Sequence, residues 1–206
     1  VTHGIESVPA HSRIVIGTRV VPELGLARLR AKGNLLEFDA AALRFTLEEA
    51  ENFLLKRAGT TLNADQITRL HRSTEGWAAA LWLASLALQR RSNTEAFIST
   101  FSGSNAAVAA YLAEDVLSAL PETDREFLLR CSVLEELSAP LCNAVCNRSD
   151  SQKLLRELDL RNLFLHPIDE QRDLYCFHSL FRDFLLNQLH KHRGGEIPSL
   201  HLAASN

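Results

Sequence analysis

The feature that most constrains the fold is a change of pattern at His178, where a strand pattern gives way to a helix pattern. Residues 174–177 read Leu-Tyr-Cys-Phe, a short apolar run after a polar turn region, which predicts the second strand of a hairpin. From Ser179 onward apolar side chains recur at helical spacing, which predicts a helix. The apolar positions of this helix are Leu180, Phe181, Phe184, Leu185 and Leu189. We therefore expect His178 at a strand-to-helix junction.

A junction of this kind is a candidate anion-binding site. Unpaired backbone N–H groups and the positive end of the helix dipole meet at a helix N-terminus, and both favour negative charge. An imidazole at that point can donate a hydrogen bond to a phosphate oxygen. The alternative is that His178 caps the helix or packs in the core. The pattern alone leaves both interpretations open.

The composition predicts a mainly α-helical chain, because Leu and Ala dominate and the 206 residues include only 9 Gly and 6 Pro. A net charge of −3 excludes a surface built to coat nucleic acid. No apolar run approaches the roughly 18 residues of a membrane span, and no charged-then-apolar leader opens the sequence. We therefore expect a cytoplasmic protein with no membrane partner.

The cysteines and the C-terminal histidines do not predict a metal site. Cys131, Cys142, Cys146 and Cys176 form no CxxC pair, although two of them lie four residues apart on a predicted helix. Buried apolar thiols are the favoured interpretation of that spacing. The histidines of residues 190–193 (His-Lys-His-Arg) lack an acid or thiol to complete a ligand set, and we expect them to be exposed.

The sequence pattern of residues 42–104 predicts a small helical domain with short connections. Thr46-Leu-Glu-Glu49 has the form of a capping box and begins a helix that runs to about residue 57. Asn63 caps a second helix, and residues 78–89 and 93–101 predict two more. Trp77 follows Gly76 at the start of the third helix, where it either fills the core or stacks on a ligand ring.

The order of the expected elements in residues 105–192 predicts a winged-helix domain, that is, three helices followed by a two-stranded wing. The expected elements are helices at 104–119, 123–134, 140–146, 151–161 and 179–190, and strands at 163–168 and 174–177. Such a unit often binds DNA through its third helix. Here that helix mixes basic and acidic side chains, which disfavours groove binding. These side chains are Lys153, Arg156, Arg161, Asp150, Glu157 and Asp159.

Residues 1–41 predict the edge of a parallel α/β sheet. The β-branched run Ile14-Val-Ile16 is typical of a strand buried on both faces, and Thr18 and Arg19 follow it at the edge where α/β sheets bind ligands. A short helix at 24–32 and a second strand at 35–38 come next. Because two strands do not make a stable sheet, we expect an upstream segment to supply the rest.

Three separated pieces resemble one class of proteins. Ile14-Val-Ile-Gly-Thr-Arg19 resembles the sensor-1 strand of STAND-class, AAA+-related NTPases, Thr74-Glu-Gly-Trp77 resembles their helical-domain motif, and Phe177-His178-Ser179-Leu180 resembles their Met-His-Asp motif. Further pieces are similar to the MalT-like family of large ATP-binding LuxR-type transcriptional activators. They are Leu26-Ala-Arg-Leu-Arg30, Leu43-Arg-Phe-Thr46, Tyr111-Leu-Ala-Glu114, Asn162-Leu-Phe-Leu165 and Phe177-His178-x-Leu-Phe181.

The resemblance implies a nucleotide site shared between a P-loop domain, the helical lid domain and the winged-helix domain. It implies ATP or ADP with Mg²⁺ in the intact protein. By this resemblance Arg19 senses the terminal phosphate, with Thr18 beside it at the binding edge. Gly76 and Trp77 border the base, and His178 contacts the β-phosphate of ADP in a closed, resting form. Residues 193–206 would form a linker or the start of a downstream helical-repeat sensor region. The implied partners are the upstream P-loop domain, that sensor region, and a second copy on activation. DNA is bound through a separate domain outside this chain.

The chain also departs from the family pattern. It has no Gly-x-x-x-x-Gly-Lys-Ser/Thr and no acid-ended strand to hold Mg²⁺, so we expect it neither to hydrolyse ATP nor to bind nucleotide tightly by itself. The intact protein is expected to be a slow switch ATPase. Ala78 stands where many relatives carry Pro, and Ser179 replaces the acid of the motif. The sequence thus predicts a regulatory fragment of an ATP/ADP-switched transcription activator, with a DNA-binding winged-helix protein or a ligand-free helical scaffold as alternatives.

Overall fold

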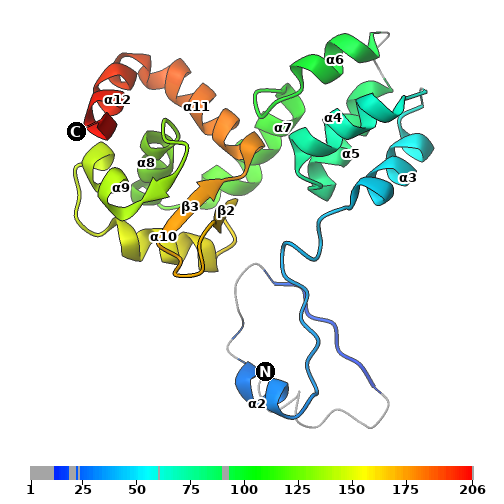
Figure 1. The fold of residues 1–206 in the computed structure, drawn as a ribbon, viewed down its shortest axis with the longest axis horizontal. Helices are drawn as coiled ribbons and strands as arrows, with labels where there is room; N and C mark the ends of the chain where they lie inside the picture. Colours follow the sequence, from blue (N-terminus) through cyan, green and yellow to red (C-terminus); the bar gives the residue numbers. More distant parts are fainter. Residues whose placement is uncertain (1–11, 19–21, 23, 60, 90–92, 206) are drawn as a thin grey trace.

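The computed structural model describes residues 12–18, 22, 24–59, 61–89 and 93–205. Within these residues the chain is mainly helical and carries one small three-stranded sheet, which confirms the predicted class. Figure 1 shows two packed units and an N-terminal part that projects away from them. One unit holds α3 to α6, and the other holds α8 to α12 with the sheet. No helix in the described part of the chain has both the length and the apolar character needed to span a bilayer.

The N-terminal part differs from the prediction, because neither expected strand forms. Residues 12–18 and 34–38 are irregular backbone on either side of a single short helix, α2 (Leu26–Ala31). Val15 is 95% exposed and Leu36 is 77% exposed. The physical reason is that an isolated extended segment has no neighbouring strand to pair its backbone groups, and these segments do not pair in the described residues. The parallel sheet itself therefore stays a prediction.

The helical unit begins where the sequence predicts. Thr46 accepts from the backbone N–H of Glu49 while the Glu49 carboxylate accepts from the Thr46 backbone, and Asn63 and Gln66 form the same reciprocal pair. Each pair satisfies two N–H groups that a helix start leaves free. The four helices are α3 (Leu47–Arg57), α4 (Ala64–Thr74), α5 (Ala78–Leu88) and α6 (Thr94–Thr100).

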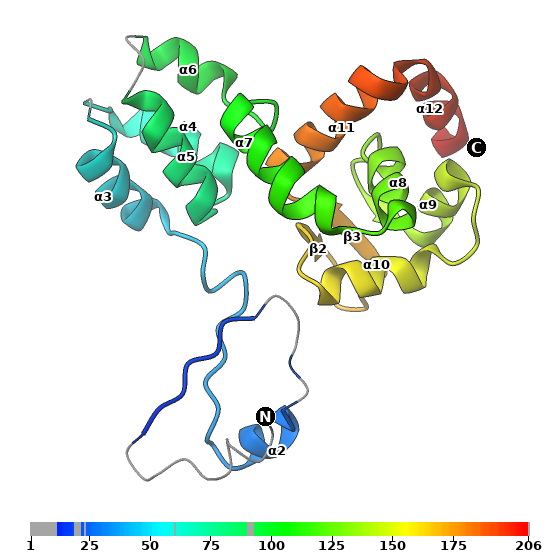
Figure 2. The same cartoon turned by 180° about the vertical axis from the view of Figure 1, so that it is seen from behind.

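A helical rod leads from the first unit to the second, as Figure 2 shows in green. The expected helix at 104–119 is present but changes its winding along its length. It consists of α7 (Ala106–Tyr111), the π-helical turn η1 (Leu112–Val116) and the 3₁₀ turn η2 (Leu117–Ala119). Just before the rod, Gly103 is buried against α11, where an added Cβ would lie 1.8 Å from the Leu180 carbonyl oxygen.

The second unit has the predicted winged-helix order with one addition, a two-residue strand that joins the edge of the wing. The sheet order is β1-β3-β2, and all neighbours are antiparallel. Leu137 pairs with Tyr175, and Leu165 pairs with Phe177. The elements are α8 (Glu122–Cys131), β1 (Leu137–Ser138), α9 (Ala139–Cys146), α10 (Ser151–Leu160), β2 (Leu165–Pro167), β3 (Leu174–Phe177) and α11 (Ser179–Arg193).

The C-terminal residues pack on the winged-helix unit. After η3 (Gly194–Glu196), α12 (Ile197–Ser205) lies against α9 and α11 and buries Leu200. Arg193 at the end of α11 forms ion pairs with Glu126 of α8 and with Glu196. The part of residues 193–206 that the structure describes is thus tied to the packed body and does not form a free linker, while its proposed relation to a sensor region stays a prediction.

Candidate functional site: the contact between the helical and winged-helix units

The turn between α4 and α5 has a backbone shape that few residues can adopt. Glu75 and Gly76 both have positive φ angles, 48° and 71°. The Gly76 carbonyl accepts a hydrogen bond from the Phe45 backbone N–H at 2.8 Å. A Cβ on Gly76 would lie 2.3 Å from the Phe45 carbonyl oxygen, so a larger residue requires the backbone to move. The Thr74-Glu-Gly-Trp77 motif therefore sets the direction in which Glu75 and Trp77 project.

His178 lies at the predicted junction and is almost completely buried, with 4% of its surface exposed. It is the N-cap residue of α11, and its Nδ1 accepts from the Leu180 backbone N–H at 3.3 Å. Its Nε2 lies 3.1 Å from the Thr74 carbonyl oxygen, so the imidazole is arranged to donate from Nε2. Burial lowers the pKa of His178 below its usual value of 6.5, although nearby Glu75 opposes this effect. The ring is therefore neutral near pH 7, and both nitrogens are satisfied.

A second hydrogen bond joins the same two segments. The Glu75 carboxylate accepts from the Ser179 backbone N–H at 2.8 Å, and its other oxygen pairs with Arg44 at 3.1 Å. Ser179 is the first residue of α11, so a negative charge from the α4–α5 turn meets the positive end of the α11 dipole. Ser179 stands where the resembled motif carries an acid, and here Glu75 supplies a carboxylate to the same helix start.

Trp77 is half-buried between the two units. Its ring centroid lies 4.9 Å from that of Phe164, 5.6 Å from that of Tyr111 and 5.9 Å from that of His178. These edge and tilted arrangements are the favoured geometries of aromatic pairs. We call this contact of residues 73–77 with His178, Ser179 and Phe164 the junction interface. It joins segments that lie about a hundred residues apart in the chain.

Three of the five predicted site residues, Gly76, Trp77 and His178, are thus brought together. Thr18 ends the extended segment 12–18, which belongs to the projecting N-terminal part in Figures 1 and 2. Arg19 lies outside the described residues, so its predicted position opposite His178 stays a prediction.

The junction interface does not by itself fit a nucleotide. Both His178 ring nitrogens are engaged by backbone groups, and Trp77 packs against aromatic side chains of the chain itself. Among the described residues no group of three or more His, Cys, Asp or Glu side chains could hold a metal ion. No switching step through ATP, ADP or Mg²⁺ follows from this arrangement alone.

The surface of α10 offers little to DNA. Each of its cationic side chains is paired with an acid, which leaves a mixed surface instead of a basic stripe. The pairs are Lys153 with Glu157 at 3.7 Å, Arg156 with Asp173 at 3.2 Å, and Arg161 with Asp124 at 2.8 Å. The sequence-based expectation that groove binding by this helix is disfavoured stays a prediction.

Sequence reasoning missed two contributors to the junction interface, Glu75 and Phe164, and also Tyr111, whose ring packs on Trp77. All three lie inside sequence pieces that had been noted for other reasons, beside Gly76, before Leu112 and after Leu163. Their partners lie far away in sequence, so no local period could reveal them. The only local signal for these contacts in the sequence was Glu75, the acid directly before Gly76.

The fold places this chain in the class of proteins in which a small helical unit precedes a winged-helix unit. Residues 113–197 match the MalT winged helix domain. Over 199 residues, or 96% of its length, the chain is 35% identical to the HTH-type transcriptional regulator MalT of Serratia proteamaculans (strain 568). The MalT proteins of Yersinia pestis (strain Pestoides F) and Yersinia pseudotuberculosis serotype O:1b (strain IP 31758) match to the same extent. The chain is thus similar to these MalT proteins, and it spans 22% of their length.

Proposed function

We propose that this chain is the regulatory section of a signal-responsive transcription activator, in which the junction interface holds the helical and winged-helix units together in a resting form. The observation that carries the proposal is the pair of hydrogen bonds from the α4–α5 turn to the start of α11, His178 Nε2 to the Thr74 carbonyl and the Ser179 N–H to Glu75. The similarity to MalT transcriptional regulators supports the regulatory role.

The interaction free energy of the junction interface is suited to a switch between two conformational states. The polar part of the interface consists of the two hydrogen bonds above and a longer one from Ser179 Oγ to the Ser73 carbonyl at 3.4 Å. Each contributes about 0.5–1.5 kcal/mol net, or more where a charged group such as Glu75 takes part. A few kcal/mol is the range in which a ligand with different affinity for two states can shift their populations. In this proposal, opening the contact separates the two units while each one stays folded.

We propose further that ATP and ADP are the ligands that shift this equilibrium. The resemblance of Arg19, Gly76, Trp77 and His178 to nucleotide-contacting positions supports this part of the proposal. For His178 to contact a phosphate, one of its two present ring contacts must be exchanged. Nucleotide binding would then be coupled directly to the interface. In this proposal, self-association and DNA binding through a separate domain follow opening.

The test is a titration of ADP and ATP into the longer protein that we propose contains this chain. Replacing His178→Ala removes the ring, and we expect ADP affinity to fall about tenfold or more relative to ATP, because a hydrogen bond to a charged group contributes about 1.5–3 kcal/mol. His190→Ala, an exposed histidine on the same helix, is the matched control and should leave both affinities unchanged. Unaltered ADP affinity in His178→Ala would contradict the assignment of a nucleotide to this residue.

A further inference from the structure

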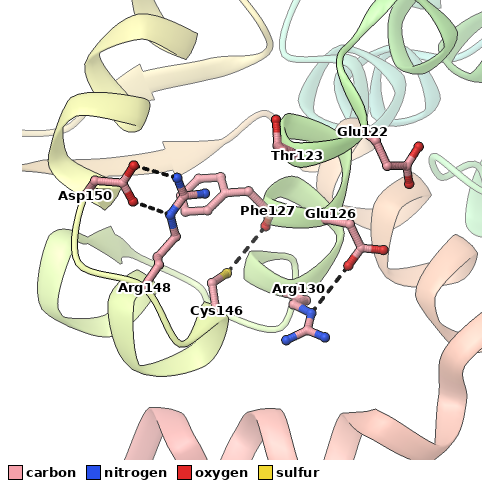
Figure 3. A pocket seen from close by; sticks show the side chains of 8 residues that line it. All are labelled: Glu122, Thr123, Glu126, Phe127, Arg130, Cys146, Arg148 and Asp150. Atoms are coloured by element: carbon pink, nitrogen blue, oxygen red, sulfur yellow. Dashed lines mark hydrogen bonds and ion pairs between the residues drawn. The ribbon is translucent and has the colours of Figure 1, made fainter.

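A pair of thiols lies apart from the junction interface, between the ends of two helices of the winged-helix unit. Cys131 is the last residue of α8 and Cys146 is the last residue of α9, and their sulfur atoms lie 3.5 Å apart. Cys131 is fully buried. Cys146 is half-buried and lines a pocket of about 410 Å³, shown in Figure 3. One thiol of the pair therefore faces solvent and the other faces the core.

The pocket places both basic and acidic side chains around Cys146, because Arg130 and Arg148 line it together with Glu122, Glu126 and Asp150. The Arg148 guanidinium lies over the Phe127 ring, 5.3 Å from its centroid, while it pairs with Asp150. The hydrogen bond with Cys131 lowers the pKa of Cys146, and the charges of Arg130 and Arg148 act in the same direction, while burial and the charge of Glu126 oppose them. Burial raises the pKa of Cys131. An accessible thiol with a lowered pKa, in contact with a second thiol, favours selective oxidation of the first.

We propose that Cys146 is a site of reversible oxidation by hydroperoxides, with Cys131 as the thiol that resolves it. The Cys146 thiolate attacks one oxygen of the peroxide, the O–O bond breaks, and the sulfur becomes a sulfenic acid while the other oxygen leaves as hydroxide, or as an alkoxide from an organic peroxide. The Cys131 sulfur then attacks the sulfenic sulfur. Its proton and the departing hydroxide form water, and a disulfide remains. For hydrogen peroxide, two thiols and one peroxide give one disulfide and two waters.

The distance between the sulfurs is compatible with this step. A disulfide requires a separation of about 2.05 Å, so the two sulfurs must approach by about 1.5 Å. Both cysteines are at helix C-termini, where a small rotation of the side chain or of the last turn can provide this approach. The bond would fasten the end of α8 to the end of α9, the helix against which α12 packs.

The other two cysteines serve as internal comparisons. Cys142 is fully buried and hydrogen-bonds Cys131, so it is a second neighbour of that thiol, but one that a peroxide does not reach from the pocket. Cys176 is half-buried and lies 3.0 Å from His166 Nε2, but burial and the nearby acids Glu75 and Glu136 raise the pKa of this thiol. We expect Cys176 to remain a thiol under conditions in which Cys146 reacts.

The experiment treats the reduced, folded 206-residue chain with hydrogen peroxide and follows it by thiol counting and disulfide mapping. The expected first product is the Cys131–Cys146 disulfide, with the loss of two free thiols and full recovery by dithiothreitol. Cys146→Ala should abolish this product, and Cys142→Ala, the matched control on the same helix, should form it at the wild-type rate. In Cys131→Ala a dimedone adduct should accumulate on Cys146.

Alkylation of the wild-type chain provides a second measurement that does not depend on a core variant. Iodoacetamide at neutral pH should modify Cys146 several-fold faster than Cys176, because the thiolate is the reacting form. A first disulfide that joins Cys131 to Cys142, oxidation of Cys176 before Cys146, or an unchanged oxidation rate in Cys146→Ala would each overturn the proposal.

Discussion

Gly76 is the residue whose replacement should most directly show what the α4–α5 turn requires. In Gly76→Ala the new Cβ would lie 2.3 Å from the Phe45 carbonyl oxygen. Gly59→Ala is a matched control in the same unit, because Gly59 also has a positive φ but its Cβ would meet only Gln89 Cγ at 3.5 Å. Both variants carry the cost of about 1–2 kcal/mol for a left-handed alanine, and Gly76→Ala should lose about 1–3 kcal/mol more from the clash. Urea unfolding measures the difference, and equal losses would contradict the close contact with Phe45.

His178 should make the fold sensitive to acid. Burial holds its pKa in the folded protein below 6.5, so in the interval below pH 6.5 the unfolded chain binds a proton that the folded chain does not bind. The contribution of this residue to stability is therefore complete above that interval and is lost as the pH falls through it. We expect the free energy of unfolding to fall more between about pH 7.5 and about pH 5.5 in the wild type than in His178→Gln. An equal fall in both proteins would contradict a lowered pKa of His178 in the folded protein.

At the scale of elements, Gly103 controls how closely the loop before α7 approaches α11. An added Cβ would lie 1.8 Å from the Leu180 carbonyl and 2.7 Å from the Phe184 backbone nitrogen, both within a helix that cannot yield locally. Gly103→Ala should therefore destabilise the chain by about 2 kcal/mol or more. Gly194→Ala has nothing within 4 Å of its Cβ and should be neutral or slightly stabilising. Thermal unfolding of both variants tests this, and a neutral Gly103→Ala would contradict the close packing.

The elements that were predictable from sequence are those specified by local pattern. The helices that begin at Thr46 and Asn63 follow from capping residues and from apolar periodicity, and the strand at residues 174–177 follows from its turn and its aromatic run. Strand β1 was missed because two residues carry no period, and it exists only through its pairing with β3. The strand expected at Ile14-Val-Ile16 failed for the complementary reason, since a β-branched run needs neighbouring strands that these residues do not have.

The same distinction applies to the candidate site. The positions of Gly76, Trp77 and His178 were recognisable from motifs, because positive φ and a helix start are local properties. Their contacts could not be recognised from the sequence. The Thr74 carbonyl and the Glu75 carboxylate bind the start of α11, which lies about a hundred residues later in the chain. Motif resemblance therefore identified the residues, and the fold defines the contacts between them.

At the scale of the whole molecule, the chain consists of two packed units joined by a helical rod and by the junction interface (Figures 1 and 2). The loop at Gly103 also packs against α11, so this loop and the junction interface together keep the units close. The polar contacts of the interface come from Ser73, Thr74, Glu75, His178 and Ser179, and its apolar contacts come from the rings around Trp77. The proposed regulatory role depends on this contact being breakable while each unit stays folded.

The most direct test is the distance between the units in solution, measured by single-molecule energy transfer between non-cysteine labels at exposed Glu51 on α3 and exposed Lys153 on α10. We expect one narrow distribution in the wild type and in a control that carries His190→Ala and Glu170→Ala, two exposed positions outside the interface. The double variant Glu75→Ala and His178→Ala should give a broader distribution at longer distance, with its helical circular dichroism unchanged. A distribution identical to that of the wild type would contradict the claim that this contact holds the two units together.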